Sequence, residues 1–176
     1  MDIIGKWKVK QLNIPTLDGV IQCTPDNMPE GEIFEEFAPM ANAIFEFTPE
    51  GSLDMLLSFS AEELEDAAKH GERVRDGYFV AESKPWKEVD GKFYYLEDIE
   101  GEVMGSEIDP YFEIKVQPDG SLMYCMDMLL LERVSSFKVF SALPRYGALR
   151  LFGRRKHRFL PERDKFINQR RKRERE

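Results

Sequence analysis

The sequence predicts a mainly β protein folded as an antiparallel up-and-down barrel, with one or two short helices and a basic C-terminal tail. Apolar and polar residues alternate in successive runs between residues 5 and 134, and tight-turn sequences separate the runs. Strands with one apolar face must bury that face, which a closed barrel or a sandwich achieves in a domain of this size. A meander of sequential hairpins favours the up-and-down barrel.

Turn sequences mark where the predicted strands reverse. Pro49-Glu50-Gly51 separates the alternating run 45–47 from the run 53–59. Pro118-Asp119-Gly120 separates the run 112–116 from a return strand that we expect to continue from Leu122 to Arg133. In such turns proline fixes φ at the first corner and glycine adopts a positive φ. A third turn is predicted at 89–92.

One helix is predicted between residues 60 and 71. Ser60 and Glu63 have the spacing of a capping box, and Gly71 follows the last apolar position. Residues 29–37 predict a second, shorter helix.

The charge of the chain divides it into two parts. The 176 residues contain 33 Asp and Glu against 25 Lys and Arg, a net charge of −8. Residues 133–176 alone hold 15 basic and 4 acidic residues, a net +11 that leaves −19 for residues 1–132. We therefore expect a barrel domain over residues 1–134 and a basic extension, partly helical or disordered, over residues 135–176.

Several classes of protein are not expected from this sequence. It contains no apolar run of about 18 residues and no apolar signal-peptide core near its start, so we expect a cytoplasmic protein. Two cysteines cannot form a disulfide framework. Cys125, in an apolar strand, is expected to be a buried hydrophobe, whereas Cys23, in a polar loop, is the more reactive candidate.

No catalytic or metal site is expected. His70 at a helix end is expected to be a surface residue, and His157 lies in the basic tail. The spacing of histidines and cysteines fits no metal site, and neither a phosphate-binding loop nor a nucleophile elbow is present. We expect a protein that is not an enzyme and uses no cofactor. A hydrolase with carboxylates at the barrel mouth, such as Glu82 or Glu97, is a third hypothesis for which the sequence supplies no geometry.

Two short motifs resemble those of a known superfamily. Ile4-Gly5-Lys6-Trp7-Lys8-Val9 resembles the Gly-x-Trp signature of the calycins, which include lipocalins and intracellular fatty-acid-binding proteins, and Arg133 is similar to the arginine that ends their last strand. The resemblance spans about residues 3 to 134. It also extends to the bacterial lipocalin-like domain of uncharacterised proteins, which carries a turn similar to residues 86–92. It implies a barrel that Trp7 and Arg133 close by a cation–π contact.

Two features depart from that pattern. The clear helix follows about the third predicted strand, whereas fatty-acid-binding proteins carry a helical lid between their first two strands. The sequence also lacks an Arg-x-Tyr pair of the kind that holds a fatty-acid carboxylate, because Val134 and Ser135 follow Arg133. This absence argues against a fatty-acid ligand.

The apolar face of the strands predicts either a filled interior or a cavity for one small ligand. Lys6, Glu46, Asp54, Glu113, Lys115 and Asp127 are expected to point outward. Methionines together with a tyrosine favour a cavity, because thioethers adapt to irregular apolar ligands and a phenol orients them. The candidate cavity-lining residues are Phe45, Phe47, Met55, Leu57, Phe59, Phe112, Ile114, Tyr124, Met126 and Met128.

Two functions follow from these observations. The leading hypothesis is a non-enzymatic protein that binds a small apolar or amphipathic molecule inside the barrel. The alternative is a filled barrel whose basic tail contacts an anionic partner, namely a membrane surface, nucleic acid or an acidic protein. The acidic body argues against nucleic acid as a partner of the body itself. The candidate residues for an anionic partner are Arg154, Arg155, Lys156, Arg158, Arg170, Arg171, Lys172 and Arg173.

Overall fold

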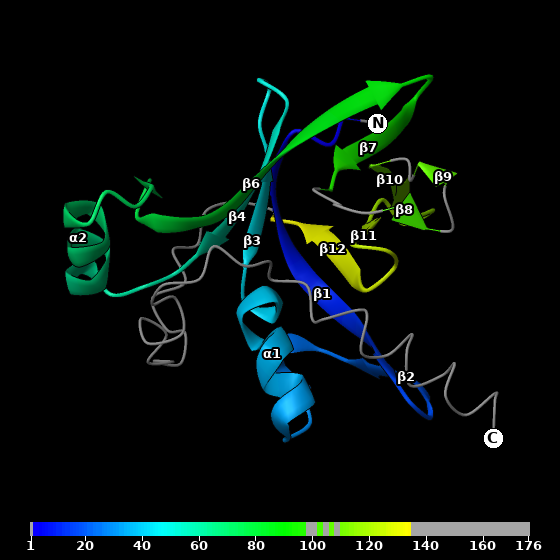
Figure 1. The fold of residues 1–176 in the computed structure, drawn as a ribbon, viewed down its shortest axis with the longest axis horizontal. Helices are drawn as coiled ribbons and strands as arrows, with labels where there is room; N and C mark the ends of the chain where they lie inside the picture. Colours follow the sequence, from blue (N-terminus) through cyan, green and yellow to red (C-terminus); the bar gives the residue numbers. More distant parts are fainter. Residues whose placement is uncertain (1, 98–101, 104–105, 108–109, 135–176) are drawn as a thin grey trace.

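The structure, a computed structural model, describes residues 2–97, 102–103, 106–107 and 110–134 (Figure 1). Eight antiparallel strands form a closed barrel, because the last strand pairs with the first. The mainly β, antiparallel barrel predicted from the sequence is therefore confirmed. In ring order the strands are β1 (Gly5–Thr16), β3 (Ile44–Phe47), β4 (Ser52–Leu57), β6 (Tyr78–Val89), β7 (Lys92–Leu96), β10 (Tyr111–Val116), β11 (Leu122–Tyr124) and β12 (Leu129–Arg133).

Four short strands of the described chain lie outside the ring. β2 (Gly19–Cys23) folds back on the second half of β1, and β5 (Val74–Arg75) pairs with the start of β6. β8 (Glu102–Val103) and β9 (Ser106–Glu107) pair only with each other among the described strands.

Both predicted helices are present. α2 (Ala61–Lys69) has the expected capping box, in which the Ser60 hydroxyl accepts from the Glu63 amide and the Glu63 carboxylate accepts from the Ser60 amide. α1 (Glu32–Ala41) follows the short 3₁₀ helix η1 (Pro25–Asn27) and begins and ends later than predicted. It lies between β1 and β3, the first two strands of the ring. α2 follows β4, the third strand of the ring, as expected from the sequence, so α1 is an additional helix between the first two ring strands.

The predicted return strand from Leu122 to Arg133 is wrong. Cys125, Met126 and Asp127 have φ values of 54°, 55° and 66° and turn the chain back between β11 and β12. The inward positions after the turn are therefore Leu129 and Leu131, which pair with Tyr124 and Leu122. In the sequence, apolar residues continue through the turn with the spacing of a strand, which concealed the reversal.

The N-terminal end of the barrel is held by Trp7 and Arg133, which lie opposite each other in the β1–β12 ladder. The Arg133 guanidinium carbon is 5.1 Å from the centroid of the Trp7 ring, and its Nη2 donates to the carbonyls of Asp2 and Ile4 at 2.6 and 3.1 Å. The Trp7 indole donates to the Ile3 carbonyl at 2.8 Å. Trp7 and Ile3 are almost fully buried, so the N-terminal segment closes onto the core through these contacts.

Gly5 explains the glycine of the Gly-x-Trp motif. Its φ of 125° is a conformation that L side chains rarely adopt, and it lies at the bend where the chain enters β1. A Cβ placed there would be in ordinary contact, 3.8 Å from the Arg133 guanidinium, so the backbone conformation is what requires glycine.

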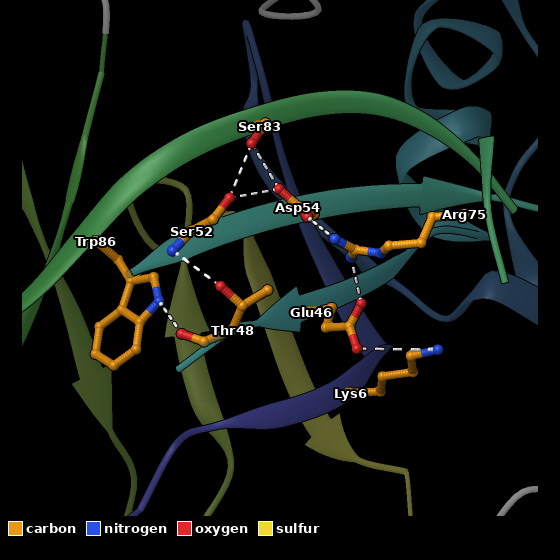
Figure 2. Close-up of polar contacts among 8 residues, drawn as sticks. All are labelled: Lys6, Glu46, Thr48, Ser52, Asp54, Arg75, Ser83 and Trp86. Carbon is orange, nitrogen blue, oxygen red and sulfur yellow. Dashed lines mark hydrogen bonds and ion pairs between the residues drawn. The ribbon is translucent and has the colours of Figure 1, made fainter. Parts of the chain in front are cut away.

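A charged network covers the outer face of β3 and β4 (Figure 2). The Asp54 side chain points outward but is fully buried, because Arg75 of β5 lies over it at 2.7 Å. Ser52 and Ser83 each donate to Asp54 at 2.6 Å, and Arg75 also pairs with Glu46. The network thereby fastens the segment that follows α2 to the barrel wall.

The electrostatics of Asp54 follow from these contacts. Burial by itself raises the pKa of the carboxyl, but the hydrogen bonds from Ser52, Ser83 and Arg75 together outweigh burial and leave the pKa below its ordinary value. The carboxylate therefore stabilises the folded state wherever it is ionised.

Replacement of Trp7 by alanine should lower the free energy of unfolding by roughly 3–5 kcal/mol, since it removes a fully buried indole and the partner of Arg133. Urea denaturation followed by circular dichroism measures this loss. Trp7→Phe keeps an aromatic face for the guanidinium and should lose clearly less. A loss near zero for Trp7→Ala would contradict this account of the barrel end.

The contribution of Asp54 should depend on pH. Because its pKa is lowered on folding, the stability that it adds is present above the unfolded pKa of about 4 and disappears as the pH falls through the folded value. The stability gap between the wild-type protein and Asp54→Asn should therefore be widest above about pH 4 and narrow below it. Urea denaturation at a series of pH values tests this, with Asp26→Asn at an exposed position as the control. A gap that is constant with pH would refute it.

Candidate functional site

The interior of the barrel contains nearly all of the predicted cavity-lining residues. Phe45 and Met55 lie opposite each other across β3 and β4, and Tyr95 lies between Trp86 and Phe112 across β6, β7 and β10. Phe45, Phe47, Met55, Leu57, Ile114 and Tyr124 are buried in one core, and Phe59, Phe112 and Met128 pack against it half-buried. Met126 is not part of that core and lies half-buried in the β11–β12 turn.

A group of charged side chains also lies on this inner face. Lys84 is opposite Leu53 and Glu82 is opposite Met55, both inward-facing partners on β4. The Lys84 ammonium lies 3.0 and 2.8 Å from the two oxygens of Glu97 and 3.2 Å from Glu82. We call Glu82, Lys84 and Glu97 the inner charge cluster.

A β-bulge places this cluster inside the barrel. The register of β4 and β6 shifts between Met55 and Leu56, so that Ala81 of β6 has no counterpart on β4. Phe79 before the bulge and Glu82 after it therefore both face inward, although they are three residues apart. Strict alternation from Phe79 would have put Glu82 and Lys84 on the outer face. The sequence therefore suggested Glu82 and Glu97 only as carboxylates at the barrel mouth and did not indicate an inward Lys84 between them.

The surroundings of Lys84 favour its charged form. Burial by itself lowers the pKa of this amine, but the charges of Glu82 and Glu97 and their hydrogen bonds outweigh burial and raise the pKa above its ordinary value. Lys84 is therefore a cation at neutral pH, and the ammonium also lies 5.8 Å from the centroid of the Tyr95 ring.

Aromatic rings stand next to the inner charge cluster. Tyr124 meets Tyr95 edge-on at 4.7 Å between centroids and Phe45 edge-on at 5.3 Å, and Tyr95 meets Phe112 at 5.8 Å. Burial raises the pKa of Tyr124 well above its ordinary value, and Cys125, Tyr95, Glu82 and Glu97 raise it further. Tyr124 is therefore a neutral phenol close to the two carboxylates.

Both cysteines are buried thiols. Burial raises the pKa of Cys125 to about 12; the Lys84 ammonium opposes this rise, and Glu97 and Glu82 add to it. The expected placement of Cys23 in a polar loop is wrong, because Cys23 ends β2 in the core and burial raises the pKa of its thiol.

The inner charge cluster lies near the end of the barrel opposite Trp7 and Arg133. Neighbouring ring strands run in opposite directions, so β7 and β11 end at the rim opposite the end of β12. Glu97 directly follows β7, and Tyr124 ends β11. The Glu82 side chain faces inward yet remains 33% exposed, so solvent reaches the interior at this point.

The remaining predictions concern the basic tail, His70 and metal binding. The tail residues Arg154, Arg155, Lys156, Arg158 and Arg170 to Arg173 lie outside the described residues, as does the predicted extension over residues 135–176. His70 caps the C-terminus of α2 on the surface, as expected. Within the described part of the chain, no group of three or more His, Cys, Asp or Glu side chains is arranged to hold a metal ion.

The described residues include no helix that is long and apolar enough to cross a membrane.

Comparisons with protein families, with curated proteins and with solved structures found no match to this chain.

Replacement of Lys84 by methionine should lower the free energy of unfolding at pH 7 by about 3–5 kcal/mol, because it leaves two neighbouring carboxylates without their cation. Lys92→Met, at a surface ion pair, is the control and should change little. A Lys84→Met protein as stable as the wild type at pH 7 would show that the ion pairs contribute nothing.

Proposed function

We propose that this chain is a non-enzymatic binding protein whose barrel interior receives a small amphipathic molecule. The observation that carries the proposal is the inner charge cluster, which places three charged groups on the inner face of a closed barrel. A barrel that only had to fill its interior would gain more from apolar side chains at these positions, since desolvating charges costs several kcal/mol. Charged side chains inside the barrel can instead bind the polar group of a ligand that enters it.

The apolar half of the ligand has a matching surface. Phe45, Tyr95, Phe112 and Tyr124 bring four rings together beside the inner charge cluster. Ligand sites in proteins characteristically combine an apolar, aromatic lining with a few polar groups that orient the ligand. An eight-stranded barrel is also wide enough to hold one small molecule.

The same residues favour binding over chemistry. Lys84 is held as a cation by two carboxylates, so its amine is not available as a nucleophile. The Cys125 thiol, with a pKa of about 12, stays protonated at neutral pH. A hydrolase acting through Glu97 would need a free carboxyl oxygen, and both of its oxygens are engaged by the Lys84 ammonium.

Titration with Nile red, a neutral environment-sensitive dye, tests the proposal. We expect saturable fluorescence enhancement with one site per chain, and native mass spectrometry of gently prepared protein should find a bound small molecule. Phe112→Trp enlarges a half-buried inner ring and should weaken dye binding about tenfold, whereas Glu113→Gln on the outer face should not. No saturable dye binding by the folded wild-type protein would overturn the proposal.

A further inference from the structure

The charges inside the barrel do not cancel. Glu82 and Glu97 carry two negative charges and Lys84 one positive charge, so the inner charge cluster has a net charge of −1. An uncompensated charge in a poorly solvated site is unfavourable unless a cation or a hydrogen-bond donor reaches it. The inner charge cluster therefore favours a positively charged ligand group.

Of the two carboxylates, Glu82 is the one open to a partner. Glu97 is 8% exposed at its side chain, and both its oxygens lie on the Lys84 ammonium. Glu82 is 33% exposed and touches Lys84 through one oxygen at 3.2 Å. An incoming cation thus meets Glu82 first, while Glu97 keeps Lys84 in place.

Tyr124 supplies a second polar group at the same place. It is 4% exposed, and its ring lies edge-on against Tyr95 at 4.7 Å between centroids. Tyr124 and the Lys84 ammonium lie against the same Tyr95 ring, at 4.7 and 5.8 Å from its centroid, which brings Tyr124 near the cluster. A phenol hydroxyl can both donate and accept a hydrogen bond, so a ligand that carries polar hydrogens can bond to it.

The rings add a further preference for positive charge. Tyr124 and Tyr95 meet edge-on, and aromatic faces attract cations that come within about 6 Å of the ring centroid. The Lys84 ammonium already lies against Tyr95 in this way. A second ammonium at Glu82 would lie between a carboxylate and aromatic surface.

We propose that the molecule bound in the barrel carries a protonated amine on an apolar body, with the amine paired to Glu82 and hydrogen-bonded to the Tyr124 hydroxyl. This inference rests on the proposed binding function and specifies the chemical class of its ligand. An anionic head group, such as a carboxylate or phosphate, would face the net negative charge of the cluster and bind less well.

Competition by a matched series of probes tests the ligand class. Decylamine, decanol and decanoate, each below its micelle concentration, would displace Nile red from the full chain at pH 7. We expect decylamine to bind about tenfold or more tightly than either of the others, as a charge-assisted contact in a shielded site allows. Decanol measures the contribution of the apolar chain alone.

Substitutions test which residues produce the preference for decylamine. Glu82→Gln keeps the side-chain shape and should reduce decylamine affinity to that of decanol, without changing decanol affinity. Tyr124→Phe should weaken decylamine severalfold and decanoate less. Glu113→Gln removes one carboxylate from the outer face and should leave the ranking unchanged.

The outcomes separate the two proposals. If Nile red binds and decanoate or decanol equals decylamine, the amine assignment is wrong and the binding function stands. If no probe and no dye binds the folded protein, both are wrong. The ranking for the wild-type protein decides the amine assignment even if a variant fails to fold.

Discussion

The pairing of β1 with β12 is the contact on which the rest of this structure depends. It turns a meander of hairpins into a ring, and a ring is what gives the strands an inside. The two ends of the folded domain meet there, with Arg133 over Trp7 and bonded to the carbonyls of Asp2 and Ile4. Because β1 and β12 are far apart in the chain, their pairing requires the hairpins between them to be in register.

Closure of the ring also gives the charges of Lys84, Glu82 and Glu97 a larger energetic effect. On an open sheet, Lys84 and its carboxylates would be ordinary surface ion pairs of little energetic weight. Inside a barrel the same three groups are partly removed from water, so their geometry and their net charge matter. The network around Asp54 has a different role. Arg75 contacts both Asp54 and Glu46, and Ser52 and Ser83 donate to Asp54, so these residues clamp β5 to the outside of the barrel wall.

Much of the fold could be predicted from local sequence. The turn at Gly51, with a φ of 85°, and the capping box at Ser60 and Glu63 are set by residues a few positions apart. The inward rows on β3, β4 and β10 follow from alternation, so Phe45, Met55 and Ile114 are buried as expected. The pairing of Trp7 with Arg133 was expected from a family resemblance and lies at the expected positions in the ladder.

The sequence by itself therefore determined the class of fold, most turns and most of the apolar inner face, because each of these depends on neighbouring residues. Only the tertiary structure decided where alternation is interrupted. The bulge at Ala81 brings Glu82 and Lys84 inside, and the left-handed turn from Cys125 to Asp127 reverses a segment that has the alternation of a strand. The bulge is set by the pairing of β6 with the earlier strand β4, which leaves no local mark, and the turn contains no glycine or proline to mark it in the sequence.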